Sequence, residues 1–425
     1  MKILVIGTGG REHALVWKIS QSDRVEKIFC PGGNAGIAKL ADTTPVDPGE
    51  NFSGYIELAK NENIELTIVG PEAPLAAGIV DAFQEAGLRI FGPNRDAARI
   101  ESSKCFAKEI MLEAGVPTGS SQVFHNSSDA LAYLENQSIP IVIKADGLAA
   151  GKGVIVAHTM QEAGEAVRAL LDDKKLGNAG DKVIIEEFLE GEEASLLAFT
   201  DGKTVTPMES SQDHKAIGEG DTGPNTGGMG AYSPAPVLDA AMQKRCLEDI
   251  MQPVINALNK RGIQYKGVLY AGLMISPKGP RVLEFNCRFG DPEIQAIIPR
   301  MENDLIEIID KVIDERLSEV KLRWKSKPAV CVVLASEGYP VKYEKGKVIE
   351  GLDQVKEEQI IFHAGTKLTN GNTITNGGRV LGVTALGDNL ENAIEKAYKM
   401  VDQIGFDGKY FRRDIGQKAL KRMEK

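Results

Sequence analysis

The stretch Val282-Leu-Glu-Phe-Asn-Cys-Arg-Phe-Gly-Asp-Pro-Glu293 decides how the rest of the chain is interpreted. It places Glu284, Asn286 and Arg288 at alternate positions, and alternate side chains of a β-strand lie on one face of the sheet. A carboxylate and an amide oxygen are hard ligands for a divalent ion that also binds nucleotide phosphates, and an arginine can bind an anionic substrate. The stretch therefore indicates a site for phosphate chemistry, and the competing interpretation is an edge strand with a solvated polar face.

Length and composition limit the classes of protein that the chain can be. Its 425 residues are too many for one ordinary core and predict roughly two to four domains. A formal charge of −10 argues against general binding to nucleic acid or to an anionic membrane. The five cysteines have no C-x-x-C spacing, and we find neither a signal peptide nor an apolar run of membrane-spanning length. We therefore expect a reduced, cytoplasmic protein.

The first hundred residues predict a parallel α/β sheet. Short apolar runs at 2–6, 25–29, 66–69 and 89–91 each end in a glycine-containing turn, and helical patterns separate them. Strands that alternate with helices form parallel sheets, whose functional loops lie at the carboxyl edge.

The pattern changes after about residue 94. Residues 97–114 predict one helix, and the strands expected after it indicate a mostly antiparallel α+β region. These strands are expected at 140–144, 154–157, 182–186, 195–200, 268–275 and 281–286. A last block of short strands begins at 328 and ends in a helix at 390–404.

The glycine cluster Gly7-Thr-Gly-Gly-Arg-Glu-His13 follows a strand and opens a helix, as a dinucleotide-binding turn does. The third glycine of that motif would fall at Glu12, and the second strand ends in Cys30-Pro31 where a ribose-binding acid is expected. Two interpretations stay open for this cluster. Either its backbone amides bind a phosphate, or the turn is purely structural.

A second glycine cluster, at residues 146–153, has one residue too few for a P-loop, and Gly153 replaces the hydroxyl that would bind magnesium. It lies between two expected strands and is bracketed by Lys144 and Lys152. Loop amides and lysines together neutralise polyphosphate charge, so a hairpin lid over a nucleotide is favoured over an ordinary glycine-rich hairpin.

Two further segments carry polar side chains in unusual density. The run from Glu186 to Glu193 ends a strand in clustered acids, and such a strand end can bind an adenine edge and ribose hydroxyls. Residues 211–234 combine many glycines with Asp213, His214 and Lys215, and a long loop of this kind inside a compact domain is usually functional. The five histidines are dispersed, and no motif for a covalent nucleophile is present.

On these residues the chain resembles the phosphoribosylamine-glycine ligases of the ATP-grasp superfamily. The similarity runs from Val-Ile-Gly-Thr-Gly-Gly-Arg-Glu-His near the start to Asn-Gly-Gly-Arg-Val-Leu near the end, so it covers essentially the whole chain. Its most specific parts are Arg288-Phe-Gly-Asp-Pro-Glu-Ile-Gln295, Asp-His-Lys at 213–215 and Gly-Gly-Met-Gly-Ala-Tyr-Ser-Pro at 227–234.

The resemblance implies a multidomain α/β and α+β protein. Its expected parts are an N-terminal parallel α/β substrate domain (1–100), a central ATP-grasp fold (101–325) with a small lid subdomain (about 118–190), and a C-terminal α+β domain (326–425).

The resemblance also implies roles for residues at an ATP site that requires Mg²⁺ or Mn²⁺. Lys104 and Lys144 are expected to contact the phosphates, and Glu284 and Asn286 to bind the metal ion. The remaining expected nucleotide contacts are Gly147, Ala150, Gly151 and Gly153 in the loop over the phosphates, Glu186, Glu187, Phe188 and Leu189 around the adenine, and Glu193 on the ribose.

The implied substrates are glycine and 5-phosphoribosylamine, with no nucleic-acid or membrane partner and a monomer as the expected state. Gly9, Gly10 and Asn34 are expected to border the ribose phosphate. The residues with implied catalytic roles are Lys144, Asp213, Lys215 and Arg288, of which the last three would also bind glycine and its acyl phosphate. The implied reaction passes through glycyl phosphate, which the amine then attacks, so positioning and charge neutralisation supply most of the catalysis.

Two other interpretations remain. A different ATP-grasp ligase, such as a purine-pathway carboxylase, a formyl-transferring relative or a biotin carboxylase, would share the nucleotide site but not the Arg-Phe-Gly-Asp-Pro-Glu and Asp-His-Lys segments. A nicotinamide-dependent oxidoreductase or a nonenzymatic nucleotide sensor would depend on the first glycine cluster alone, and the missing third glycine disfavours the oxidoreductase.

Overall fold

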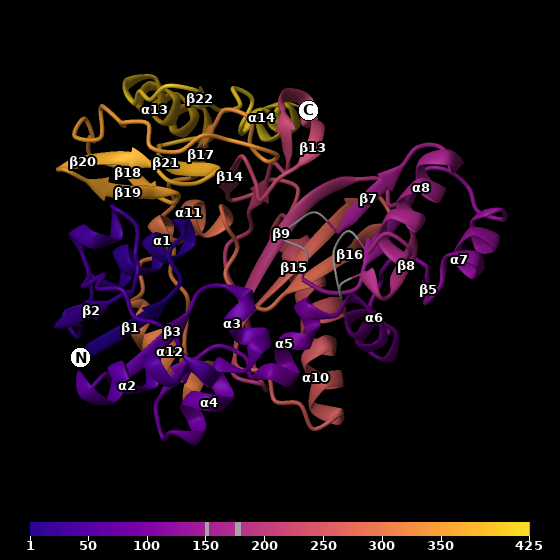
Figure 1. Cartoon of the computed structure of the whole chain (residues 1–425), viewed down its shortest axis with the longest axis horizontal. Coiled ribbons are helices and arrows are strands. Elements are labelled where there is room, and N and C mark those ends of the chain that lie inside the picture. Colours follow the sequence, from indigo (N-terminus) through magenta and orange to yellow (C-terminus); the bar gives the residue numbers. More distant parts are fainter. Residues whose placement is uncertain (149–152, 175–179, 425) are drawn as a thin grey trace.

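The computed structural model describes residues 1–148, 153–174 and 180–424 (Figure 1). The N-terminal strands form one parallel sheet, in the order β2-β1-β3-β4, as predicted. The strands are β1 (Lys2–Ile6), β2 (Lys27–Phe29), β3 (Leu66–Val69) and β4 (Ile90–Phe91), and the helices are α1 (Gly10–Ile19), α2 (Ser53–Asn61), α3 (Glu72–Ala77) and α4 (Ile79–Glu85).

The helix predicted at 97–114 is wrong, because two helices occupy this part of the chain. Helix α5 (Arg95–Ser102) ends before Ser103, whose backbone is extended, and α6 (Lys104–Glu113) begins directly after it. The Ser103 hydroxyl accepts a hydrogen bond from the Phe106 amide and caps α6. Asp146 binds the same corner, accepting hydrogen bonds from the Ser103 hydroxyl and the Cys105 amide. The break therefore ties the start of α6 to the segment that precedes the second glycine cluster.

The lid subdomain is a four-stranded antiparallel sheet, in the order β5-β8-β6-β7, with two helices against it. Its elements are β5 (Ser121–Phe124), α7 (Ser127–Leu134), β6 (Ile141–Ala145), β7 (Val154–Ala157), α8 (Met160–Leu171) and β8 (Val183–Glu187). Its buried apolar side chains form a cluster that contains residues of this subdomain alone. It lies at the right of Figure 1, beyond the central sheet.

The central sheet is antiparallel, in the order β10-β9-β15-β16. Its strands are β9 (Glu192–Thr200), β10 (Val205–Pro207), β15 (Gly267–Ser276) and β16 (Gly279–Asn286). The neighbouring helical segments are α9 (Ala240–Cys246), a π-helical turn at Leu247–Met251, α10 (Gln252–Lys260), α11 (Glu293–Ile297) and α12 (Leu305–Ile313). The predicted antiparallel architecture of this region is confirmed.

A β-bulge in β16 determines which of its side chains lie in the core. Gly272 pairs with Glu284 and Leu273 pairs with Val282, so Leu283 is an extra residue. Val282 is buried in the core, and simple alternation would place Glu284 on the same face. Because the bulge shifts the alternation by one residue, Phe285 and Cys287 lie in the core instead.

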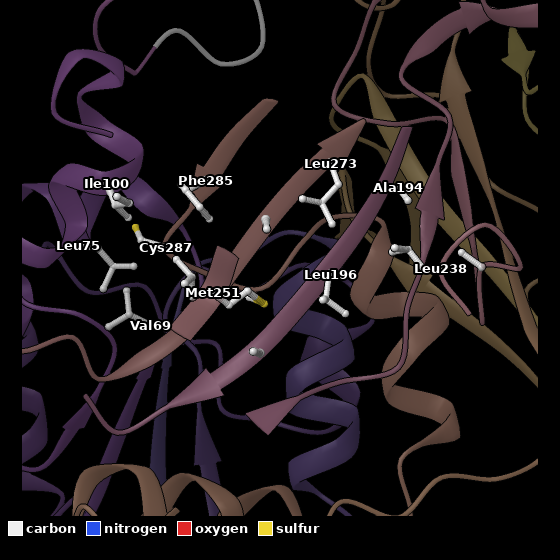
Figure 2. Packing of buried hydrophobic residues seen from close by; sticks show 14 of the residues in the cluster. Val69, Leu75, Ile100, Ala194, Leu196, Leu238, Met251, Leu273, Phe285 and Cys287 are labelled. Atoms are coloured by element: carbon white, nitrogen blue, oxygen red, sulfur yellow. The ribbon is translucent and has the colours of Figure 1, made fainter. Parts of the chain in front are cut away.

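Figure 2 shows the apolar cluster beneath this sheet. Side chains from β9, β15 and β16 pack with those of the helices and the N-terminal domain. The labelled members are Val69, Leu75, Ile100, Ala194, Leu196, Leu238, Met251, Leu273, Phe285 and Cys287. The same cluster includes Val332 and Val383 of the C-terminal sheet, so the three main domains share one core.

The C-terminal sheet has the order β11-β14-β17-β21-β18, and β22 also pairs with β17. Its strands are β11 (Gln212–Asp213), β14 (Gly230–Ser233), β17 (Ala329–Ser336), β18 (Gln359–His363), β21 (Arg379–Leu386) and β22 (Lys409–Tyr410). The remaining elements are the hairpins β12 (Ala216–Gly218) with β13 (Thr222–Asn225) and β19 (Thr366–Thr369) with β20 (Asn372–Thr375), and the helices α13 (Leu390–Gln403) and α14 (Gln417–Met423).

Residues 211–234, predicted as a long loop, contain four of these short strands, and that prediction is wrong. β11 and β14 extend the C-terminal sheet, although they precede it by about a hundred residues in the chain. Arg412, which is fully buried, donates hydrogen bonds to Ala216 O (3.0 Å) and to both Asp221 and Asp414. Main-chain pairing with β17 and the buried charge of Arg412 therefore hold residues 211–234 against the C-terminal domain.

All five cysteines are buried and free. Among the helices in the described ranges, none combines the length and the apolar character that a membrane crossing requires.

The shared core predicts a strong effect of Leu196→Ala. Leu196 is fully buried in the cluster of Figure 2, so the variant should lower the free energy of unfolding by about 2–5 kcal/mol through lost burial and a residual cavity. Leu112→Ala is the matched control because Leu112 is 73% exposed, and a shift below about 0.5 kcal/mol is expected there. Denaturant unfolding measures both values, and equal values for the two variants would contradict this account of the core.

Candidate functional site

A cavity of about 530 Å³ lies between the lid, the central sheet, the N-terminal helices and the C-terminal domain. Its size is within the range of small-molecule sites. Most site residues predicted from the sequence line it. These are Lys104, Lys144, Gly147, Gly153, Glu186, Glu187, Phe188, Leu189, Glu193, Asp213, Lys215, Glu284, Asn286 and Arg288.

Five predicted residues are not among the described residues that line this cavity. Ala150 and Gly151 lie outside the described residues. Gly9, Gly10 and Asn34 are not part of the lining of this cavity. The Asn34 amide group donates to Thr8 O (2.9 Å) and His363 O (2.7 Å), and its oxygen accepts from the Gly36 and Ile37 amides. Asn34 thus joins the first glycine turn to the C-terminal domain, and the substrate role of these three residues stays a prediction.

The first glycine cluster encloses a carboxylate of its own chain. Glu12 is buried, and its Oε2 accepts a hydrogen bond from the Gly9 amide at 2.6 Å. A Cβ atom at Gly7, Gly9 or Gly70 would lie within 3.0 Å of the Glu12 side chain, so only glycine leaves room for it. The glycines of this turn therefore leave room for a buried glutamate.

At the lid side of the cavity, Glu186 forms ion pairs with two lysines. Lys108 contacts one carboxylate oxygen and Lys144 the other, and all three side chains are buried. Lys144 Nζ also donates to Leu283 O at 3.0 Å, the carbonyl of the extra residue in the bulge. The bulge therefore helps to place Lys144. The carboxylate of Glu186 is thus bound by lysines, and its backbone lies in β8, between β5 and β6.

Lys104 and Glu187 flank this group. Lys104 Nζ donates to Gly147 O at 3.1 Å, and burial lowers its pKa, against which the charge of Glu284 acts. Glu187 binds Arg281 through two hydrogen bonds of 2.8 Å, and this pairing lowers the Glu187 pKa to about 2. Charged groups therefore hold both Gly147 and the end of β8 in place.

Lys215 lies among carboxylates at the centre of the cavity. Its Nζ is 3.2 Å from Glu193 Oε2 and 3.5 Å from Glu284 Oε1. Burial disfavours the charge of Lys215, but Glu193 and Glu284 more than offset it and raise the Lys215 pKa. Burial likewise disfavours an ionised Glu284, yet Lys215 and then Lys144 hold its pKa below the ordinary value. Glu284 is therefore an anion, as a metal ligand must be.

The pKa of the Asp213 carboxyl group is raised, whereas that of Glu284 is lowered. Burial and then the charge of Glu293 raise the Asp213 pKa to about 8, while Lys215 acts against them. Glu293 is held in place by Tyr270 Oη, which donates to its Oε1 at 2.6 Å, and by the Ser195 hydroxyl at 3.3 Å. The carboxylate of Glu293 therefore lies close enough to Asp213 to contribute to the raised pKa of Asp213.

The donor set of Glu284 and Asn286 fits a divalent ion bound beside nucleotide phosphates. Both line the cavity from β16, and both offer oxygen ligands. Magnesium is commonly bound by one or two protein oxygens together with water and substrate phosphates, so no larger protein cage is needed. Within the described part of the chain, no group of three or more His, Cys, Asp or Glu residues forms such a cage.

Arg288 is bound on every nitrogen. Nε donates to Glu72 Oε2 (3.1 Å), Nη1 to Phe289 O (3.2 Å) and Nη2 to Asn286 Oδ1 (3.3 Å), and Nη2 also lies 3.0 Å from Glu101 Oε1. Burial disfavours the guanidinium charge, but Glu101 and Glu72 more than offset it and raise the Arg288 pKa.

Several residues of the cavity were not predicted from the sequence. Lys108 lies in a helical segment without a motif, and Glu293 was named only as the end of the segment 282–293. Arg379 donates to Gly227 O and to Asp291 O (2.8 Å), and its Nη2 is 3.1 Å from Asp291 Oδ2. Its signal was present in Asn-Gly-Gly-Arg-Val-Leu. Glu72 and Glu101 lie in segments without a distinctive motif, so only the tertiary contact shows their connection with Arg288.

Family models match three consecutive parts of the chain. The phosphoribosylglycinamide synthetase N domain matches residues 1–101, the ATP-grasp (A) domain residues 102–294, and the C domain residues 329–418.

Individual proteins agree with the family models. The chain is 51% identical to the phosphoribosylamine-glycine ligases of Vibrio parahaemolyticus and Haemophilus influenzae, with 99% of each chain covered. The crystal structure of that ligase from Thermotoga maritima has a TM-score of 0.84 at 32% identity and covers 98% of this chain and 100% of its own. A biotin carboxylase of Campylobacter jejuni, at 16% identity with 100% and 95% coverage and a TM-score of 0.75, shows the fold alone. The chain belongs to the phosphoribosylamine-glycine ligase family, within the ATP-grasp fold.

Proposed function

We infer that the chain catalyses the ATP-dependent ligation of glycine to 5-phosphoribosylamine in purine biosynthesis. Glycinamide ribonucleotide, ADP and phosphate are the products. This inference depends on two observations that agree. The chain is similar to these ligases over its full length, and Asp213, Lys215, Glu284 and Arg288 line one cavity. The biotin carboxylase of Campylobacter jejuni has the same fold, but its sequence is only 16% identical to this chain.

We propose that the reaction has two steps. A carboxylate oxygen of glycine attacks the γ-phosphorus of ATP, the bond to the bridging oxygen breaks, and glycyl phosphate and ADP form. The amine nitrogen of phosphoribosylamine then attacks the acyl carbon. The bond between that carbon and the phosphate oxygen breaks, phosphate leaves with the bonding electrons, and the nitrogen loses a proton. No side-chain nucleophile takes part, so the chain contributes by positioning and by neutralising charge.

The nucleotide is proposed to lie between the lid and the central sheet. Lys104 and Lys144 are placed to contact its phosphates, residues 187–189 to contact the adenine, and Glu193 to bind the ribose. Glu284 and Asn286 would hold Mg²⁺ or Mn²⁺, which supplies charge neutralisation on the phosphates when bound. The buried lysines around Glu186 already lie in a low-dielectric region where their charge acts strongly.

The glycine end is proposed to lie near Lys215, Asp213 and Arg288. Asp213, with a pKa near 8, shares its surroundings with Glu293 and is suited to exchange a proton with the amine nitrogen. The proposed domains remain 1–100, 101–325 with the lid at about 118–190, and 326–425, and the central domain would then contribute β11 and β14 to the C-terminal sheet. Cytoplasmic location agrees with five free cysteines, and the monomeric state stays a prediction.

Removing the proposed metal ligand gives the first test of the site. Glu284→Ala should abolish detectable product formation and leave the fold intact, because Glu284 lines the cavity and has no part in the core. Product is followed by mass spectrometry at ordinary magnesium, and folding by circular dichroism. Glu85→Ala, at an exposed position of α4, is the matched control and should keep normal turnover. Normal turnover in Glu284→Ala would remove this residue from the site.

Arg288→Lys tests the glycine end of the cavity. A lysine cannot reproduce contacts with Glu72, Glu101 and Asn286 at once, since its ammonium is a single point of charge. We expect nearly normal binding of ATP by calorimetry, and a loss of about ten-fold or more in glycine-dependent ADP release. Wild-type product formation would exclude Arg288 from the reaction, whereas weakened ATP binding alone would assign it to the nucleotide.

A further inference from the structure

The side chain of Arg288 on the central domain is held by two carboxylates from other parts of the fold. Glu72 is the first residue of α3 and follows the carboxyl end of β3 in the N-terminal domain. Glu101 lies in the last turn of α5, and its second oxygen accepts a hydrogen bond from the Cys287 amide at 2.8 Å. Both side chains line the same cavity as Arg288. The arginine is therefore fixed from two sides as well as through its neighbouring backbone.

The geometry limits what Arg288 can offer a ligand. A guanidinium has five N–H donors, and the contacts to Glu72, Glu101, Asn286 and Phe289 O account for four of them. One N–H of Nη1 is left. A paired hydrogen bond to a carboxylate would require two, so this arrangement favours a single, well-oriented contact. The orientation of that one donor is then set by the acids on the other nitrogens.

The surroundings make these contacts strong. The side chain of Glu101 is 8% exposed and that of Arg288 is 18% exposed, so water screens the pair only weakly. Arg11 is a second cation near Glu72, with Nη1 at 3.8 Å from its Oε2, and Arg11 Nη1 also donates to Phe289 O. Glu72 thus lies between an arginine of its own domain and one of the central domain.

We propose that Glu72 and Glu101 are positioning residues of the ligase reaction, which act by orienting Arg288 beside Asn286. Glu72 also makes the N-terminal domain part of the catalytic geometry, since its carboxylate accepts a hydrogen bond from Arg288 of the central domain. This proposal rests on the proposed function and deepens it. It assigns to both glutamates an effect on turnover.

The effect expected from Glu72→Gln is on the rate. Glutamine preserves the shape of the side chain and removes the charge that holds Nε, and a hydrogen bond to a charged group is worth about ten-fold to a hundred-fold in rate or affinity. We expect kcat for product formation to fall about ten-fold or more. In Glu72→Gln the affinity for ADP with magnesium, measured by calorimetry, should stay within about two-fold of the wild type, because Glu72 contacts no lysine of the nucleotide side. Glu101→Gln is the second variant and should show the same fall in kcat.

A double-mutant cycle separates positioning from a general structural role. If Glu72 acts through Arg288, adding Glu72→Gln to Arg288→Lys should reduce kcat by less than about two-fold further, because the partner is already lost. Multiplied losses in the double variant would show independent effects and overturn the proposal. So would normal kcat in both Glu72→Gln and Glu101→Gln.

Asp314→Asn is the matched control. Arg89 and Asp314 form another ion pair between the N-terminal and central domains, at 2.9 Å, and neither residue lines the cavity. Normal kcat is expected there, and thermal unfolding of every variant verifies that the fold persists. An inactive wild type with glycine, ATP and phosphoribosylamine would overturn the proposed function and this inference together, whereas an active wild type with unaffected glutamate variants would overturn the inference alone.

Discussion

The extra residue at Leu283 is the constraint on which the site depends. Without the bulge, the alternation that buries Val282 would also direct Glu284 and Asn286 into the core, where unpaired polar groups are costly. With it, Phe285 and Cys287 complete the core of Figure 2 while the polar side chains face the cavity. The same irregularity leaves the Leu283 carbonyl available to Lys144. One backbone insertion therefore serves both faces of the sheet, as bulges beside active sites often do.

Charge pairing is the second organising principle of the cavity. Several cations that line it have a fixed acidic partner: Glu186 holds Lys108 and Lys144, Glu193 and Glu284 hold Lys215, and Asp291 holds Arg379. Lys104 instead donates to the Gly147 carbonyl. Buried ion pairs add little to stability, but they restrict side chains that would otherwise lose considerable entropy on binding a ligand. A reaction that proceeds by positioning of substrates benefits from this order, because the groups need little reorganisation when charge develops on the phosphoryl group.

The sequence predicted the fold and most of the residues that line the cavity, for identifiable reasons. Strong periodicity indicated the parallel sheet and the antiparallel sheets, and the spacing of Glu284, Asn286 and Arg288 was informative because all three follow the bulge. Two local features could not be predicted from the sequence. The break at Ser103 depends on a cap and on Asp146, and β14 within 211–234 pairs with β17, which lies about a hundred residues later. Glu72 and Glu101 were missed because an ordinary glutamate acquires meaning only through its partner across the domain boundary.

The separate core of the lid has a consequence for how the chain tolerates variation. Apolar contacts are what make a part of a protein melt as a unit, and the lid residues pack against one another in a cluster that does not merge with the shared core. Substitutions inside that cluster, for example at Ile143 or Val167, would therefore loosen the lid while the remaining domains stay folded. Substitutions in the shared core would then reduce the amount of folded protein. Substitutions in the lid cluster would leave that amount unchanged and would alter only the lid.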